Sequence, residues 1–329
     1  MIVDCHVHLS AMCGAHGSMS PRMLNSLPFR FMRWRFGIWG TDEQAERAIE
    51  GTLARTIQET PEIDAAVVLA FDAVYDRDGQ LDPARTHLHV ANDYVMDVAR
   101  RNPKMLFGAS VHPYRKDAVA ELERCISAGA VLLKWLPVVQ AFNPTDEKCI
   151  PVYETLVHYG LPLLCHTGWE GTLPVLDGAM ADPLLLEPAL KRGVTVIGAH
   201  CGTRGMPWQG GYLAQFIRLA REYERFYGDT AALNLPARWY AWRRLLEDEQ
   251  IRRKLVHGSD WPIMPLPPPA RLGWGPAWRL MGERNWMRRD VLIKQKMGLD
   301  EAYWQRAGKI LRLKREAEVP REGEAPVVP

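Results

Sequence analysis

Short apolar runs rich in Val, Ile and Leu recur along the chain, and they alternate with longer segments whose apolar residues follow helical spacing. The runs lack the polar alternation of a half-exposed antiparallel strand, which indicates parallel strands covered on both faces. They predict eight strands, at residues 2–8, 65–71, 105–111, 130–136, 161–166, 194–200, 226–230 and 254–260.

Amphipathic segments between these strands predict helices, among them residues 42–60, 83–101, 117–128, 183–192, 212–223 and 236–248. Pro83, Pro183 and Pro236 suit first-turn positions, and Gly129 and Gly193 stand where helices should end. Eight strand–helix units in alternation predict an α/β fold, the (β/α)8 or TIM barrel. An open, doubly wound sheet is disfavoured, because no GxGxxG follows the first strand.

Two predicted connections are unusually long, residues 9–40 after the first strand and residues 261–299 after the eighth. Both leave the carboxyl ends of strands, where a barrel has its active site, so we expect lids or substrate walls there. Residues 29–40 interleave arginines with aromatics. A lid or a homodimer contact is favoured for them over single-stranded nucleic acid or a membrane interface. We expect the barrel to span residues 1–314, followed by a flexible tail at 315–329.

The composition narrows the class of protein. With 329 residues, 47% of them hydrophobic, the chain can bury a large core, and its formal charge of +2 does not indicate a nucleic-acid partner. No apolar run is long enough for a membrane-spanning helix, and the start of the chain lacks a basic, apolar leader, so we expect a cytoplasmic protein without a membrane partner. The six scattered cysteines form no CxxC pair and are expected to be reduced.

Metal-binding side chains end several of the predicted strands. His6 and His8 are two residues apart in the first strand, so both imidazoles face the same side and can reach one ion. His166, His200 and Asp260 end the fifth, sixth and eighth strands. Strand ends converge in a barrel, so these five side chains predict a metal site rather than core packing.

Four short motifs carry these residues: DCHVH at 4–8, LCHTG at 164–168, AHCG at 199–202 and GSDWP at 258–262. Together they resemble the amidohydrolase superfamily, and more closely its amidohydrolase-related branch, which includes aminocarboxymuconate-semialdehyde decarboxylase. The resemblance implies that His6, His8, His166 and Asp260 bind a divalent metal. It implies that His200 is either a ligand of a second metal or a catalytic group that polarises the substrate.

Lys134 interrupts an apolar strand, and a buried ammonium group is costly unless it is paired or chemically neutralised. In binuclear amidohydrolases that resemble phosphotriesterase, a lysine ending the fourth strand is carboxylated and bridges two metals. Lys134 stands one strand–helix unit before His166, which fits that position. An ion pair with an acid such as Glu170, or contact with a substrate carboxylate, is the alternative.

Three tryptophans adjoin the candidate ligands in sequence. Trp135, Trp169 and Trp261 predict a pocket wall for a planar or apolar substrate, with packing at the barrel rim as the alternative. Arg204 closely follows the sixth strand and could bind a carboxylate.

The favoured function is a metal-dependent hydrolase acting on an amide, ester or lactone bond of a small organic substrate through water activated by one or two divalent ions, preferably Zn²⁺. Asp260 would accept the proton of that water, and His200 or a metal would polarise the carbonyl. The alternative enzyme is a nonhydrolytic decarboxylase of an aromatic or muconate-like acid. A binding or scaffold barrel is disfavoured because no candidate ligand is missing.

Overall fold

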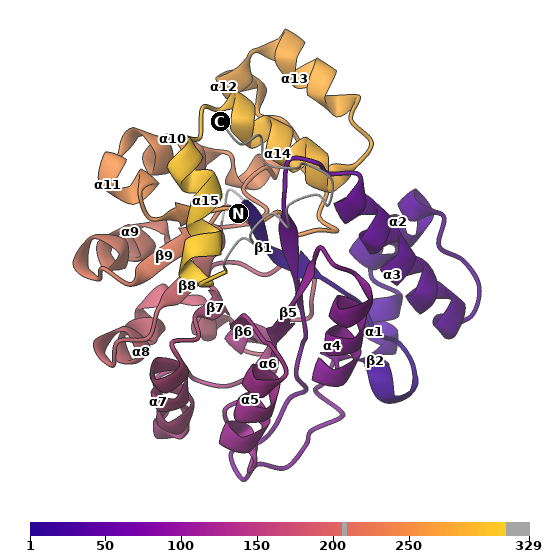
Figure 1. Ribbon diagram of the computed structural model, residues 1–329, viewed down its shortest axis with the longest axis vertical. Helices are drawn as coiled ribbons and strands as arrows, with labels where there is room; N and C mark the ends of the chain where they lie inside the picture. The colour runs from indigo at the N-terminus through magenta and orange to yellow at the C-terminus, as the bar shows by residue number, and fades with distance from the viewer. Residues whose placement is uncertain (206–208, 314–329) are drawn as a thin grey trace, which may run out of the picture.

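The computed structural model describes residues 1–205 and 209–313, which form a barrel of parallel strands (Figure 1). Each strand pairs with the next in the order β1 (Val3–His8), β3 (Ala65–Leu69), β5 (Met105–Ala109), β6 (Leu132–Trp135), β7 (Leu163–His166), β8 (Val196–Ala199), β9 (Phe226–Asp229) and β10 (Leu255–Val256). The last strand returns to the first, because Cys5 N donates to His257 O at 3.1 Å and His8 N donates to Trp261 O at 2.9 Å. The predicted (β/α)8 barrel is therefore confirmed.

Helices follow the strands around the outside of the barrel, as Figure 1 shows. They are α3 (Asp42–Gln58), α4 (Asn92–Arg101), α5 (Ala118–Ser127), α7 (Ile150–Tyr159), α8 (Glu187–Lys191), α9 (Leu213–Glu222), α10 (Tyr240–Glu247) and α15 (Glu301–Ile310). Gly129 and Gly193 lie just after α5 and α8 with φ of 96° and 89°, the left-handed backbone that ends helices. Both glycines thus stand where the sequence predicted helix ends.

The helix predicted at residues 83–101 is wrong in its first half. Residues Leu88–Val90 instead form strand β4, which pairs antiparallel with β2 (Gly17–Met19), and helix α4 begins only at Asn92. Pro83 therefore does not start a helix. The cause is tertiary, because β2 belongs to the first long connection and supplies hydrogen-bond partners that a local pattern cannot reveal.

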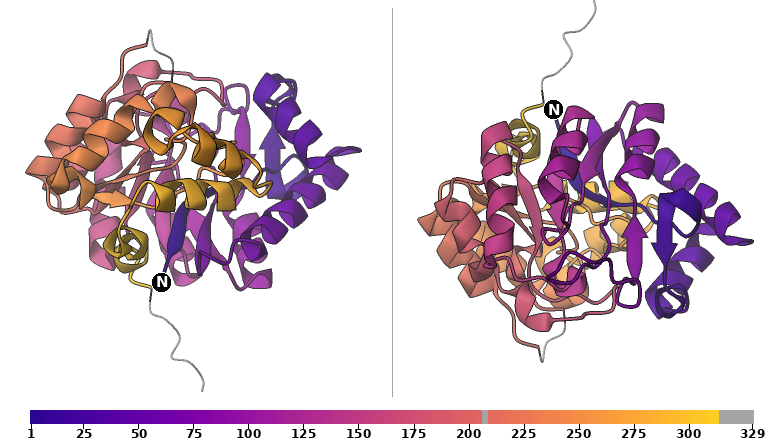
Figure 2. Two further views of the ribbon diagram at one scale, coloured as in Figure 1. Left: turned by 90° about the horizontal axis from the view of Figure 1, so that it is seen from above. Right: turned by 90° about the horizontal axis from the view of Figure 1, so that it is seen from below.

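The two long connections pack against each other. The first contains α1 (Pro21–Leu24) and α2 (Leu27–Phe36), and the second contains α12 (Pro269–Leu272), α13 (Trp274–Met281) and α14 (Trp286–Lys296). The Phe36 ring lies 5.6 Å from that of Trp261 and 4.9 Å from that of Trp286. Figure 2 shows both insertions from two further sides.

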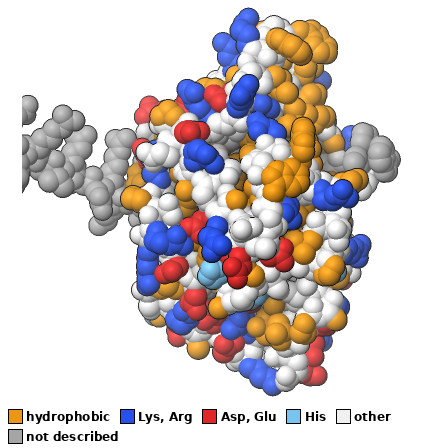
Figure 3. All heavy atoms as spheres, turned by 90° about the vertical axis from the view of Figure 1, so that its right-hand side faces the viewer, with side chains coloured by type: hydrophobic (Ala, Val, Ile, Leu, Met, Phe, Trp, Pro, Cys, Tyr) orange, Lys and Arg blue, Asp and Glu red, His pale blue; other side chains and the backbone are white. Residues whose placement is uncertain are grey.

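Aromatic side chains remain exposed on these insertions. Trp274 and Trp278 of α13 are each 81% exposed, and hydrophobic side chains gather over that helix at the top of Figure 3. Trp34 and Trp39 are also more than half exposed, whereas Phe29 and Met32 of α2 are buried. The homodimer contact stays a prediction, and the tail predicted at 315–329 lies outside the described residues.

Inside the barrel, an apolar layer supports the polar strand ends. Leu132 and Leu164 belong to a buried cluster formed mostly by strand residues. Lys134 and His166 stand two residues further along the same strands and so face the same interior. No helix in the described ranges is both long and apolar enough to cross a membrane.

Candidate metal centre

The structure brings the six predicted metal-binding or catalytic side chains together at the carboxyl end of the barrel. A cavity of about 120 Å³ is lined by His6, His8, Lys134, His166, His200 and Asp260. His6 and His8 belong to β1. Lys134 comes from β6 and His166 from β7, and the other two follow β8 and β10. Convergence of these ends was the central expectation from the sequence, and it is met.

Three donor atoms lie close enough to share one ion. The distances are 3.1 Å between His6 Nε2 and His8 Nε2, 3.0 Å between His8 Nε2 and Asp260 Oδ1, and 3.4 Å between His6 Nε2 and Asp260 Oδ1. Ligand atoms about 2.1 Å from a metal stand roughly 3.0–3.4 Å apart in octahedral or tetrahedral geometry. The residues present therefore fit a divalent ion.

Hydrogen bonds at Nδ1 fix the orientation of two of the imidazoles, His6 and His200. His6 Nδ1 donates to Asp229 Oδ2 at 2.7 Å, and His200 Nδ1 donates to the carbonyl oxygen of Ala231 at 2.9 Å. With Nδ1 protonated, each Nε2 keeps a lone pair for a ligand. His166 Nε2 is buried and has no hydrogen-bond partner among the described residues. Because His166 also lines the cavity, this nitrogen is available to a ligand there.

Asp229 is a site residue that the sequence reasoning missed. Besides the bond to His6, its Oδ1 accepts the backbone N–H of His200 at 2.7 Å, so one buried carboxylate positions two candidate ligands. Asp229 ends β9, and the strand-end rule that selected the other residues could have found it. Its second oxygen orients His6 rather than pointing free into the site.

The electrostatics of the site favour the metal-binding forms of these side chains. Burial lowers the pKa of His6, His166 and His200 well below the usual value, with Lys134 and Arg238 adding to the effect, so all three are neutral near pH 7. Burial alone would raise the pKa of Asp260, but His6, His8 and Arg238 hold it below its usual value. Neutral imidazoles and an ionised carboxylate are the states that a metal requires.

Lys134 is completely buried, and its Nζ lies 3.0 Å from His6 Nε2. Burial lowers its pKa, although Asp229 and Asp260 oppose that effect. The predicted alternative partner, Glu170, instead lies 3.7 Å from His166 Nδ1 and accepts two backbone N–H groups. Within the described chain, no carboxylate lies within ion-pair distance of the ammonium.

The backbone is strained at both residues predicted to be catalytic. His200 and Asp260 have φ of 61° and 65°, in the left-handed region that disfavours residues other than glycine. Each such conformation costs about 1–3 kcal/mol and persists only where the surroundings impose it. Both residues follow the ends of their strands, β8 and β10, and both side chains line the cavity.

The residues predicted to form the pocket wall lie elsewhere. Trp135 packs against Phe142 at 4.9 Å, Trp261 packs against Phe36, and the guanidinium of Arg204 stacks over Tyr240. Trp169 is half-buried. None of these four is among the described residues that line the cavity.

Other side chains form the apolar wall of the cavity. They come mainly from the two long connections and from strand ends, and include Met23, Phe29, Met32, Phe71, Leu173 and Ile263. The expectation that both connections wall the site is thus met. The part of residues 29–40 that serves as wall is the inner face of α2.

Arg238 is a second residue that the sequence reasoning missed. It ends the short helix η6 (Pro236–Arg238), is 4% exposed, and donates from Nη2 to the carbonyl oxygen of Trp169 at 2.8 Å. Its Nε and Nη1 have no partner among the described residues. The charge of Arg238 lowers the pKa of His166, His200 and Asp260, so it lies beside the candidate metal centre.

Fold and site together define an enzyme of the barrel type with a cluster of metal-binding side chains. The family model for amidohydrolases matches residues 3–285. The chain belongs to this family, as the motifs indicated. No curated protein matches it by sequence.

Solved structures support the same fold. An uncharacterised TIM-barrel protein from Bordetella bronchiseptica has a TM-score of 0.57 at 17% identity, over 90% of this chain and 99% of that one. A protein assigned as a 2-pyrone-4,6-dicarboxylic acid hydrolase from Pseudomonas putida has a TM-score of 0.57 at 16% identity, over 94% of this chain and 97% of that one. The 5-carboxyvanillate decarboxylase of Sphingomonas paucimobilis has a TM-score of 0.55 at 13% identity, over 95% of this chain and 99% of that one. Both hydrolases and decarboxylases therefore share this architecture.

Proposed function

We propose that the protein is a metal-dependent hydrolase of an ester, lactone or amide bond in a small organic molecule. The observation that carries this proposal is the triangle of His6 Nε2, His8 Nε2 and Asp260 Oδ1, with sides of 3.0–3.4 Å. His166, whose Nε2 is unpaired, completes the ligand set. Imidazole and carboxylate donors favour Zn²⁺ among the common divalent ions. Such an ion supplies a Lewis acid that activates water.

Asp260 is the proton acceptor in this proposal. Its low pKa keeps it ionised near neutral pH, and it lies at the edge of the cavity where it can take a proton from the attacking water and pass it to the leaving group. His200 donates its Nδ1–H to Ala231, so its Nε2 offers a lone pair and not a proton. This tautomer favours His200 as a ligand over His200 as a polarising acid.

Lys134 is the residue on which the number of metal ions depends. Its pKa is lowered by burial, and an uncharged amine can add CO₂ to become a carboxylated lysine. We propose that Lys134 carries this modification and that, with His200, it would hold a second ion beside the first. A decarboxylase with one ion and an unmodified Lys134 is the second candidate, favoured by the unpaired guanidinium beside the site, which suits an acidic substrate.

Elemental analysis of the purified protein, with the mass of the intact chain, tests the choice. Two ions per chain with a carboxylated lysine, followed by turnover of a lactone or ester panel, supports hydrolysis. One ion with CO₂ release from aromatic acids supports the second candidate. A protein that binds no divalent ion would overturn both.

The role of Asp260 needs its own variant. Asp260→Asn keeps the shape and one ligand oxygen but cannot accept a proton, so turnover should fall by about 10²–10⁴-fold while much of the metal stays bound. Turnover within about threefold of the parent would move the role to His200.

A further inference from the structure

The two long connections carry charge of one sign only. Residues 5–41 and 261–282 contain no Asp, Glu or Lys, and apart from histidine their charged side chains are Arg22, Arg30, Arg33, Arg35, Arg271 and Arg279. None of these arginines has an ion-pair partner among the described residues, whereas Arg101, elsewhere on the surface, pairs with Glu50 at 2.6 Å. The two insertions therefore carry a positive charge that no acid of their own balances.

Helix α13 turns its apolar stripe outward. Trp274, Trp278 and Met281 follow the spacing i, i+4 and i+7, so they share one side of the helix. Both tryptophans are 81% exposed, whereas Ala277 is buried. A helix whose outer side met only water would have polar residues there instead.

Helix α2 has the same arrangement. Leu27, Phe31 and Trp34 repeat the spacing i, i+4 and i+7 and are exposed, while Phe29 and Met32 are buried on the inner side. The inner side already serves as a wall of the cavity, so the outer stripe is surplus to the substrate site.

The outer sides of α2 and α13 are joined through the start of α14. The Phe31 ring stacks 6.1 Å from that of Trp286, and Arg35 Nη2 donates to the carbonyl oxygen of Arg284 at 3.3 Å. Seen from the side of α2, hydrophobic and basic side chains lie next to one another at the top of Figure 3, over α13. We call this surface the insertion face. Its exposed side chains are Leu27, Arg30, Phe31, Trp34, Arg271, Trp274, Trp278, Arg279 and Met281.

We propose that the insertion face binds the surface of an anionic phospholipid membrane. Helices that lie in a membrane interface combine exposed Trp, Phe and Leu, which enter the headgroup layer, with basic side chains, which attract anionic lipids. The insertion face offers both kinds of side chain and no acid of the insertions to repel such lipids. This proposal does not depend on the chemistry of the metal centre.

Two other occupants fit the insertion face less well. A second copy of the chain, the homodimer contact expected from the sequence, would bring the arginines of both copies together in a two-fold contact without an acid of the insertions between them. Single-stranded nucleic acid stacks its bases on aromatic rings, and Leu27 and Met281 offer none. A lipid layer accepts aliphatic and aromatic side chains alike.

Co-sedimentation with vesicles tests the proposal. The protein should bind vesicles of phosphatidylcholine with phosphatidylserine at least about tenfold more tightly than vesicles of phosphatidylcholine alone, and high salt should remove most of that difference. Trp274→Ser together with Trp278→Ser should weaken binding by about tenfold or more, because the side chains that enter the lipid layer are lost. Arg30→Gln together with Arg279→Gln should weaken binding to the anionic vesicles by about 10–30-fold.

Matched controls lie on helices far from the insertion face (Figure 1). Arg243→Gln together with Arg253→Gln removes the same charge from exposed positions in α10 and just after α11. Tyr159→Ser removes an aromatic side chain that is 43% exposed on α7. Both controls should bind the anionic vesicles as the wild type does. All replaced side chains are exposed, so every variant should fold, which thermal unfolding checks.

The other occupants are outcomes of the same test. A dimer in sedimentation velocity that Trp274→Ser together with Trp278→Ser dissociates would overturn the proposal in favour of a second copy. Tighter binding to a thymidine oligonucleotide than to the anionic vesicles would overturn it in favour of nucleic acid. The proposal also fails if the wild type does not bind the anionic vesicles, or if the face variants bind them as strongly as the controls do.

Discussion

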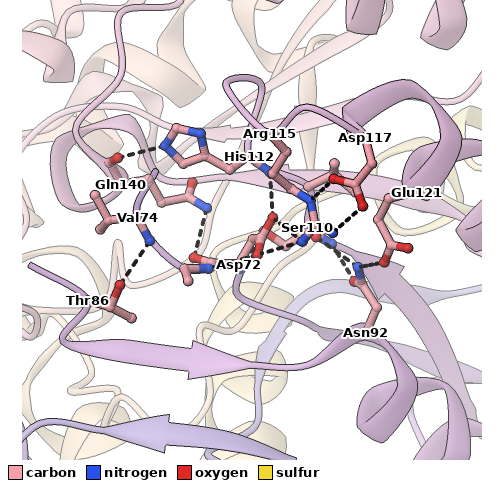
Figure 4. Close-up of polar contacts among 12 residues, drawn as sticks. Asp72, Val74, Thr86, Asn92, Ser110, His112, Arg115, Asp117, Glu121 and Gln140 are labelled. Carbon is pink, nitrogen blue, oxygen red and sulfur yellow. Dashed lines mark hydrogen bonds and ion pairs between the residues drawn. The ribbon is translucent and has the colours of Figure 1, made fainter. Parts of the chain in front are cut away.

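Two buried polar clusters occupy the strand ends of this barrel, and they differ in how completely their atoms are paired. The metal centre uses β1 and β6 to β10. The second cluster surrounds Asp72 and Ser110, just after β3 and β5 (Figure 4). There, Asp72 accepts the backbone N–H of His112 at 2.7 Å and pairs with Arg115 at 3.3 Å. His112 Nε2 donates to the carbonyl oxygen of Gln140 at 2.9 Å.

The side chains labelled in Figure 4 leave no buried nitrogen or oxygen without a partner, whereas the metal centre leaves His166 Nε2 and two nitrogens of Arg238 unpaired. A cluster that satisfies its own hydrogen bonds stabilises the fold, whereas unpaired atoms beside a cavity can bind a ligand. The clusters meet where Ser110 Oγ donates to the carbonyl oxygen of Lys134 at 3.0 Å. The paired cluster thus supports the strand that carries Lys134.

The largest expected effect is on metal binding. His166→Ala removes a candidate ligand, so metal affinity should fall by more than about 100-fold. Loss of a residue that only orients a ligand usually lowers metal affinity by about 10–100-fold. His257→Ala is the control, because His257 is equally buried but packs against Tyr303 and Trp304. Elemental analysis after dialysis measures both. Full metal content in His166→Ala would remove the basis of the site.

Asp72→Ala should act on stability instead. It deprives Arg115 of a buried partner and two backbone N–H groups of their acceptor, so the free energy of unfolding should fall by about 3 kcal/mol. Denaturant titration of the metal-free protein measures this loss. Metal content should be unchanged, and a variant that lost metal without losing stability would contradict the comparison.

The paired cluster should also respond to acid. Burial lowers the pKa of His112 from 6.5 to about 4, so His112 is neutral in the folded protein and its contribution to stability is complete above pH 6.5. As the pH falls from 6.5 towards 4, the unfolded chain takes up the proton first, and about 3 kcal/mol of stability is lost. Unfolding of wild type and His112→Asn across this range checks the effect. Parallel pH profiles would show that His112 does not titrate as stated.

The smallest expected effect concerns the residue that orients two ligands. Asp229→Asn removes the acceptor that fixes the His6 tautomer, so metal affinity should fall by about 10–100-fold, while His6 and His200 stay in place. Metal titration of the variant measures this, with Asp72→Asn as the control in the other cluster. An unchanged affinity would mean that Asp229 is only structural.

The residue pattern by itself determined the barrel and the convergence of five site residues. Parallel strands buried on both faces leave continuous apolar runs, and strands of one barrel all end on the same side, so His6, His166 and Asp260 could be brought together without any contact being known. The resemblance of four motifs to the amidohydrolase superfamily led to the same residues.

Tertiary structure decided the pocket wall, and the reason is the alternation of side chains in strands. Trp135 follows Lys134 in β6, where neighbouring side chains point to opposite sides, and it packs against Phe142 instead. Trp261 follows Asp260 beyond the end of β10 and packs against Phe36, so nearness in sequence misled the prediction for both. The apolar wall, the β2–β4 pairing and the unpaired guanidinium of Arg238 arise between segments far apart in the chain. No local pattern records which of these distant segments will meet.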